Sequence, residues 1–131
     1  MRYVALLLIG IFIGALACVA AIGAMRQGTP YDGAVMAVMS QQMGALRGMR
    51  ERNACDAAEI DRRLALLGAI AGETEAAFLP IGDDARFTQL SQDLRDAVAA
   101  ARSHQAANCD ALAKAMTGVG GSCKACHDMF R

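Results

Sequence analysis

The sequence predicts an all-α protein: an antiparallel up-down-up-down four-helix bundle, preceded by an N-terminal apolar helix that is either a transmembrane anchor or a signal segment. Along four segments after residue 30, apolar residues recur every three or four positions, which is the period of one helical face. Short polar stretches join these segments, and short connections make neighbouring helices antiparallel. No segment alternates with the period of two that is typical of a strand. A chain of 131 residues has room for one compact domain.

Residues 1–25 form a membrane-entering segment in this prediction. No charged residue occurs from Tyr3 to Met25, and Arg2 supplies positive charge before the apolar run. The run of roughly 23 residues would span ~34 Å as a helix, enough to cross a bilayer core. Ile22-Gly23-Ala24 could instead serve as a signal cleavage site. Both alternatives place the rest of the chain outside the cytoplasm, either anchored on the periplasmic side of a bacterial inner membrane or soluble in the periplasm.

Cys18 lies within this apolar run. Its position suggests a lipoprotein site, but Ala15-Leu16-Ala17 departs from the usual signature and an apolar stretch follows. We interpret Cys18 as a small apolar residue of the segment.

Residues 26–30 read as a linker, and the domain proper is expected over 31–131. The first helix should run from Tyr31 to about Arg52, and the second from a cap at Asp56, with Glu59 three positions later, to about Phe78. The expected buried stripes of these two helices consist of Val35, Met36, Met39, Met43, Leu46 and Met49, and of Ile60, Leu64, Leu67 and Ile70 or Ala71.

The third helix should cover about Asp84 to Arg102, and the fourth should begin near Asn108 and continue to the chain end. His104 falls in the turn between them, where we expect a solvated surface histidine. The expected buried stripes consist of Phe87, Leu90, Leu94 and Val98, and of Leu112, Met116 and Val119.

The charge balance excludes a nucleic-acid partner. Lysine and arginine number 13, aspartate and glutamate 13, and the formal net charge is +0. Phosphate binding needs a basic stripe, which this sequence lacks.

The chemistry-bearing motif is Cys123-Lys124-Ala125-Cys126-His127, the Cys-X-X-Cys-His run to which c-type haem attaches. Cysteines at i and i+3 share one helix face, so both thiols can reach one haem edge, and His127 can ligate the iron. Gly118, Gly120 and Gly121 remove side chains where the macrocycle must approach. A zinc site would need two more suitably spaced ligands, and a thioredoxin-like pair would need a βαβ context. The motif therefore predicts one covalent haem c.

The C-terminal stretch Val119–Arg131 resembles the signature of the cytochrome c′ family, four-helix haem proteins with the attachment motif near the chain end. Cys55–Ile60 and Ala76–Phe78 are similar to the start and end of the family's second helix. The resemblance covers about Tyr31–Arg131 and includes the family's low-spin Met/His relatives. It implies a possible homodimer through the first two helices. Arg131 matches a family arginine near the proximal histidine, although a cation complementing the helix C-terminus explains it as well.

Met36 falls at the family's distal haem position, where high-spin members carry a bulky apolar residue and low-spin relatives a methionine ligand. The family pattern begins with arginine, and this chain has Asp32 there, which puts a cation near the haem propionates in doubt. Methionines at helical spacing also fill packed cores. Met36 is therefore either the distal iron ligand or a core residue.

Cys55 and Cys109 flank two connections at the same end of the predicted bundle. In an oxidising compartment they could form a disulfide that closes a loop of about fifty residues. The alternative is two separately buried thiols.

The expected function is electron transfer by a c-type cytochrome, with no enzymatic activity. A membrane redox complex or a soluble electron carrier would be the partner. The alternatives are a five-coordinate haem protein that binds NO or CO beside a crowding Met36, and a haem-bearing accessory subunit of a membrane redox complex.

Overall fold

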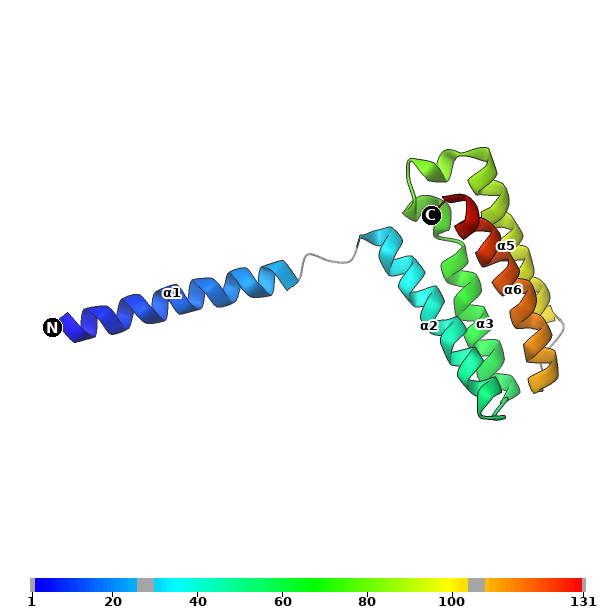
Figure 1. Ribbon diagram of the computed structural model, residues 1–131, viewed down its shortest axis with the longest axis horizontal. Helices are drawn as coiled ribbons and strands as arrows, with labels where there is room; N and C mark the ends of the chain where they lie inside the picture. Colours follow the sequence, from blue (N-terminus) through cyan, green and yellow to red (C-terminus); the bar gives the residue numbers. More distant parts are fainter. Residues whose placement is uncertain (1, 26–29, 104–107, 131) are drawn as a thin grey trace. The chain divides into compact units, whose positions relative to one another are not determined.

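The structure is a computed structural model that describes residues 2–25, 30–103 and 108–130. All regular structure in these ranges is helical, which confirms the predicted all-α class (Figure 1). The chain divides into two compact units, residues 1–30 and 31–131. Residues 26–29 of the expected linker and His104 lie outside the described residues.

The first unit consists of helix α1 (Arg2–Met25). Large apolar side chains along it are exposed, among them Leu7, Phe12, Leu16 and Val19. No helix within the described residues is both long enough and apolar enough to cross a membrane. Of the two alternatives predicted for residues 1–25, an anchor or a signal segment, the structure therefore does not support the transmembrane anchor.

The second unit is a four-helix bundle made of α2 (Tyr31–Glu51), α3 (Ala57–Ala71), α5 (Ala85–Ser103) and α6 (Cys109–Phe130). Helix α2 packs against α3 and α6, and α5 packs against the same two helices on the other side. Short links connect the helices, so neighbours in the sequence run antiparallel (Figure 1).

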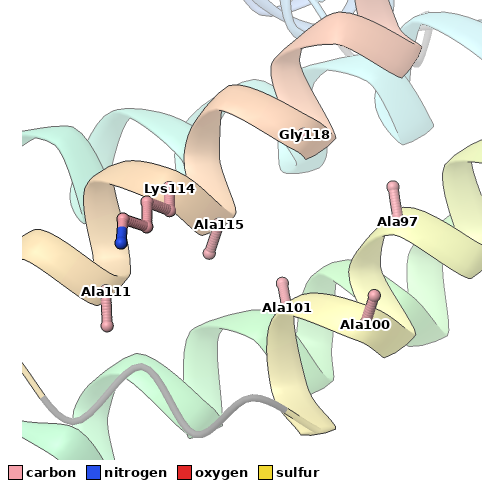
Figure 2. A pocket seen from close by; sticks show the side chains of 7 residues that line it. All are labelled: Ala97, Ala100, Ala101, Ala111, Lys114, Ala115 and Gly118. Atoms are coloured by element: carbon pink, nitrogen blue, oxygen red, sulfur yellow. The ribbon is translucent and has the colours of Figure 1, made fainter.

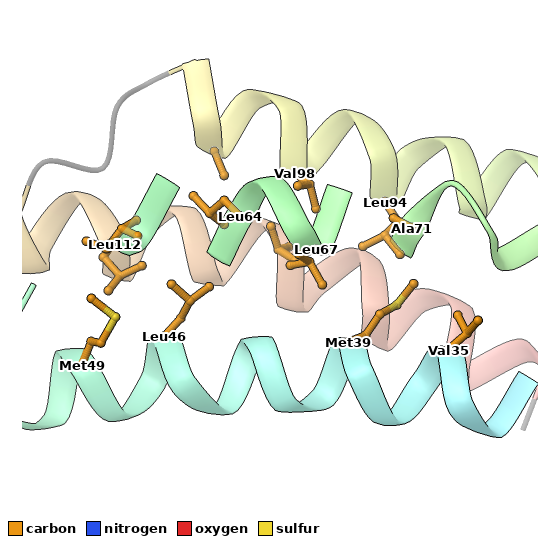
Figure 3. Packing of buried hydrophobic residues seen from close by; sticks show 13 residues of the cluster. Val35, Met39, Leu46, Met49, Leu64, Leu67, Ala71, Leu94, Val98 and Leu112 are labelled. Atoms are coloured by element: carbon orange, nitrogen blue, oxygen red, sulfur yellow. The ribbon is translucent and has the colours of Figure 1, made fainter. Parts of the chain in front are cut away.

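The core lies along the axis of this bundle, and the predicted stripes supply it (Figure 3). Leu46, Leu67 and Leu112 are fully buried, one from each of three helices. Burying a side chain of this size stabilises the fold by about 1.5–3 kcal/mol. Of the methionines in the α2 stripe, Met39 and Met49 are buried, whereas Met36 and Met43 are partly buried against the core.

Side-chain caps begin three of the helices. The Asp56 carboxylate accepts a hydrogen bond from the Glu59 amide at 2.8 Å, which confirms the predicted start of the second helix. Asp84 accepts from the amides of Arg86 and Phe87, and Asn108 from that of Ala111. Each such cap contributes about 1 kcal/mol.

The predicted second helix is wrong in its length, because it ends at Ala71 and not at Phe78. The Gly72 amide divides its hydrogen bond between the carbonyls of Gly68 and Ala69, and the Thr74 hydroxyl donates to the Ala71 carbonyl at 3.0 Å. The Thr74 hydroxyl satisfies the Ala71 carbonyl in place of a backbone amide, and Gly72 has low helix propensity. The helix therefore ends at Ala71.

Two short elements then lead to α5: α4 (Thr74–Ala77) and the 3-10 helix η1 (Ile81–Asp83). Gly82 joins them closely, because a Cβ atom at Gly82 would lie 2.0 Å from the Glu75 carbonyl oxygen. Glycine is therefore required where this connection folds back on itself.

A disulfide joins Cys55 to Cys109, with the two Cα atoms 5.3 Å apart. It links the segment before α3 to the first residue of α6. The sequence leaves open a disulfide or two separately buried thiols, and the structure shows the disulfide.

Candidate functional site

The candidate site lies in the last turns of α6, on the side of this helix that faces the bundle core. The residues of its inner stripe alternate four and three positions apart, so they share one helix face. Leu112 and Val119 on this stripe are fully buried. The stripe consists of Leu112, Met116, Val119, Cys123, Cys126 and Phe130. The two motif cysteines thus occupy positions where a bundle helix normally carries core side chains.

The thiols of Cys123 and Cys126 are free and partly buried. Burial raises the pKa of both, and the neighbouring Cys126 adds to the rise at Cys123. Cys123 packs against the hydrophobic core. A raised pKa and apolar surroundings favour the protonated thiol over the thiolate. They therefore suit thioether formation with a flat apolar molecule better than direct binding of a metal, which needs a thiolate.

Protein ligands alone do not complete a metal site here. Within residues 2–25, 30–103 and 108–130, no group of three or more His, Cys, Asp or Glu side chains could hold a metal ion. The described residues therefore do not extend Cys123 and Cys126 into a closed zinc site.

Open space adjoins the helix backbone just before the cysteines. A Cβ atom added at Gly118, Gly120 or Gly121 would have no neighbour within 4 Å. Gly118 and Gly121 are exposed, so these glycines leave the surface of α6 bare on the sides away from its inner stripe. The thiol pair and its apolar surroundings fit a covalently bound haem.

Three phenylalanines hold the end of α6 in place. The rings of Phe87 and Phe130 meet edge to face with centroids 5.2 Å apart, and Phe78 lies 5.6 Å from Phe87. Phe130 continues the inner stripe of α6, so this contact fixes which face of the helix turns inward. Phe87 was predicted as a buried residue of its helix, which is confirmed, whereas Phe130 was not predicted although it has stripe spacing.

His127 follows Cys126 directly and is exposed. On the outer side of the same turns, the Lys124 ammonium pairs with the Asp128 carboxylate at 2.5 Å. The structure thus brings the three predicted haem residues, Cys123, Cys126 and His127, together on one helical segment. Arg131 lies outside the described residues.

Met36 is on α2, which packs against α6. Its side chain is partly buried and contacts the same core cluster as Cys123. Asp32 lies one turn earlier, in the first turn of α2, where a carboxylate is stabilised by the positive end of the helix dipole. That interaction explains an acidic residue at a position where the family has arginine.

A separate groove of about 490 Å³ runs between α5 and α6 (Figure 2). Lys114 is the one charged residue of its lining, and no iron-ligating side chain contributes. The groove is therefore not the place where a haem iron would be held. Its other lining residues are Ala97, Ala100, Ala101, Ala111, Ala115 and Gly118.

A helical bundle whose last helix carries Cys-X-X-Cys-His, with both cysteines on its core-facing stripe, defines the class of c-type haem proteins. The family model described as Cytochrome C' matches residues 29–131. The chain therefore belongs to the cytochrome c′ family, and its cofactor is covalently bound haem c.

Solved structures agree with this assignment. The chain is 30% identical to a leucine-to-isoleucine variant of cytochrome c prime from Alcaligenes xylosoxidans in complex with nitric oxide, with a TM-score of 0.68, covering 77% of this chain and 90% of that one. A ferrous arginine-to-lysine variant from the same organism, also with bound NO, is 28% identical with a TM-score of 0.66, covering 76% and 88%. No curated protein matches this chain.

Proposed function

We propose that this protein is an electron carrier whose haem iron would be held by His127 and Met36. The observation that carries the proposal is the place of Met36, which is partly buried on α2 and packs against the core that also receives Cys123. When bound, haem c supplies an iron that cycles between the ferrous and ferric states. A methionine and histidine ligand pair raises the reduction potential of such an iron.

Some residues of the chain would attach the haem, and others would exclude water from it. Cys123 and Cys126 fix the macrocycle to α6, and the Phe87–Phe130 contact fixes the orientation of that helix. Val35 and Met39, both buried on α2, would exclude water from the side of the haem on which Met36 lies. A site held by packing on both sides changes little on electron transfer, which suits a carrier and requires no enzymatic activity.

A second candidate function is the binding of NO or CO. It is favoured by the relatives from Alcaligenes xylosoxidans, whose structures hold nitric oxide. In this alternative Met36 does not ligate the iron and only crowds an open position.

Replacing Met36 with Ala separates the two functions. For the carrier, the oxidised spectrum of the wild type is low-spin and the reduced protein does not take up CO, whereas Met36→Ala becomes high-spin and binds CO. Met43→Ala is the matched control, because Met43 is also a partly buried methionine of α2. An unchanged oxidised spectrum in Met36→Ala, together with CO uptake by the wild type, would replace the carrier with the gas-binding function.

We also propose that residues 1–25 export the haem domain to the periplasm, where it works either released or retained at the membrane. A membrane redox complex or a soluble carrier is the proposed partner, and a dimer through α2 and α3 stays a prediction. Fractionation of cells and intact-mass measurement of the mature chain test this. A mature protein that begins near residue 25 in the soluble periplasmic fraction supports release. The full chain in the membrane fraction supports retention, and the full chain in the cytoplasm contradicts export.

A further inference from the structure

The end of the bundle that carries the haem motif has an unusual share of exposed apolar side chains. Within the described part of residues 31–130, five large apolar side chains are exposed, and four of them lie at this end: Tyr31, Leu79, Ile81 and Met129, with 54%, 62%, 46% and 54% of their surface exposed. They come from the start of α2, the connection between α3 and α5, and the last turn of α6, which share one end of the bundle (Figure 1). We call these four residues the apolar centre.

Contacts between these segments hold the centre together. The Tyr31 hydroxyl donates a hydrogen bond to the Glu73 carboxylate at 2.8 Å, which ties the start of α2 to the α3–α5 connection. The Phe87–Phe130 contact ties the end of α6 to the start of α5. The end surface is therefore built from separate segments that are fixed to one another.

Acidic side chains surround the apolar centre. Asp32, Glu73, Asp83 and Asp84 belong to the same segments, and Glu75 and Asp128 are the two further carboxylates there, paired with Arg95 and Lys124. We call the first four the acidic rim. Among the residues of these segments that the structure describes, Arg86 is the one cation without a salt bridge.

The opposite end of the bundle has no such excess of carboxylates. Arg47, Arg50 and Arg52 lie in and just after the last turns of α2, and none forms a salt bridge among the described residues. Glu51, Asp56 and Asp110 lie at the same end and balance these three arginines, so of the two ends, as far as the structure describes them, the haem end has the excess of unpaired carboxylates. Such a distribution orients a charged partner before contact.

We infer that the acidic rim and the apolar centre form the docking site for a redox protein whose own cofactor edge has an apolar patch ringed by lysine and arginine. The inference rests on the proposed function, because it places the electron exit at the haem end. In the step, ferrous haem gives one electron and becomes ferric, and the oxidised partner is reduced by one electron. No bond forms or breaks. Opposite charge around a small apolar contact gives fast, short-lived association, as electron transfer requires.

Charge decides against two other occupants. A second copy of this chain docked end to end would bring two acidic rims together, and juxtaposed like charges cost several kcal/mol. Charge likewise opposes seating the rim on an anionic lipid surface, so the rim stays open to a protein partner even where residues 1–25 hold the domain at a membrane.

The first test uses small redox probes and two charge variants. The ferrous protein is oxidised by the tricationic tris(phenanthroline)cobalt(III) or by the trianionic ferricyanide at low ionic strength. Asp83→Asn with Asp84→Asn should slow the cobalt reaction about five-fold and speed the ferricyanide reaction. Asparagine at position 84 keeps the cap of α5. The control, Glu51→Gln with Asp110→Asn, makes the same charge change at the opposite end and should alter both rates far less.

The second test measures binding without electron transfer. Chemical-shift titration of the ferric protein with a lysine-rich ferric c-type cytochrome should perturb the haem end, and Leu79→Ser should weaken the association about ten-fold. Leu66→Ser, the same change at the exposed leucine of α3, should leave it unchanged. Equal effects of the paired variants in both tests would overturn the docking site. Intact binding combined with ferrous protein that neither probe oxidises would instead overturn the carrier function, so the two failures are distinguishable.

Discussion

The two ends of the bundle are closed by different means. At one end, the Cys55–Cys109 disulfide joins the start of α3 to the start of α6, and caps at Asp56 and Asn108 begin both helices. At the other, two thiols remain free on the inner stripe of α6, and the contact between the Phe87 and Phe130 rings holds the helix end. The comparison indicates that the chain completes one end with its own sulfur atoms and leaves the other to be completed by the cofactor.

The largest effect is expected from removing the free thiols. Cys123→Ala with Cys126→Ala should abolish covalent attachment, since no thioether can then form at the motif. Intact-mass measurement of protein matured in a host with haem-attachment machinery should show the wild type as polypeptide plus haem and the variant as polypeptide alone. Cys18→Ala is the control and should retain the haem. A haem adduct in the double variant would contradict the site.

Opening the other end should cost stability but not the cofactor. The disulfide spans a sequence separation of 54 residues, so Cys55→Ser with Cys109→Ser should lower the free energy of unfolding by about 4 kcal/mol in the chain-entropy model. Denaturant unfolding of the haem-loaded protein measures this, and its visible spectrum should match the wild type. A changed spectrum would show that the two ends are not independent.

A smaller effect is expected from Gly82→Ala, in the connection at the haem end. The added Cβ would lie 2.0 Å from the Glu75 carbonyl, so the backbone must move, at a cost of about 2 kcal/mol in the free energy of unfolding. Gly44→Ala is the matched control, because its Cβ meets nothing and alanine favours the helix by up to about 1 kcal/mol. Thermal unfolding compares the two, and equal melting temperatures would contradict the close contact.

The smallest effect concerns pH at the disulfide end. Hydrogen bonds from Arg62 and Arg63 lower the pKa of Glu59 from 4.5 to about 2. A carboxyl with a lowered pKa in the folded state stabilises the protein above its ordinary pKa, and this contribution disappears as the pH falls through about 2. The free energy of unfolding of the wild type should therefore fall slightly more than that of Glu59→Gln between pH 5 and pH 2. Identical pH profiles would show that the two ion pairs are screened by solvent.

The bundle itself was predictable because apolar periodicity records burial directly. Leu46, Leu67 and Val98 each belong to the apolar stripe of a different helix, and all three are buried. The end of α3 was not predictable in the same way. The apolar pattern continues past Gly72, and what stops the helix is the hydrogen bond from Thr74 to the Ala71 carbonyl, which no periodicity reveals.

The site could be located from the sequence because the attachment motif is local. Cys123, Cys126 and His127 lie within five residues, so no tertiary information was needed to group them. The contacts that support the motif come from distant segments, as Phe87 and Phe130 do, and the pairing of Cys55 with Cys109 depends on the fold. Glu59 likewise was expected to close a capping box, but its carboxylate accepts hydrogen bonds from Arg62 and Arg63.

The length of α6 also determines which cysteines of the bundle can form a disulfide during maturation. Cys109 and Cys123 are fourteen helical residues apart, or ~21 Å along the axis, whereas a disulfide needs Cα atoms within about 7 Å. Once α6 has formed, an oxidant can join Cys109 to Cys55 without trapping it with Cys123. The thiols that must stay reduced for thioether formation are thus protected from that mispairing by distance along a rigid helix.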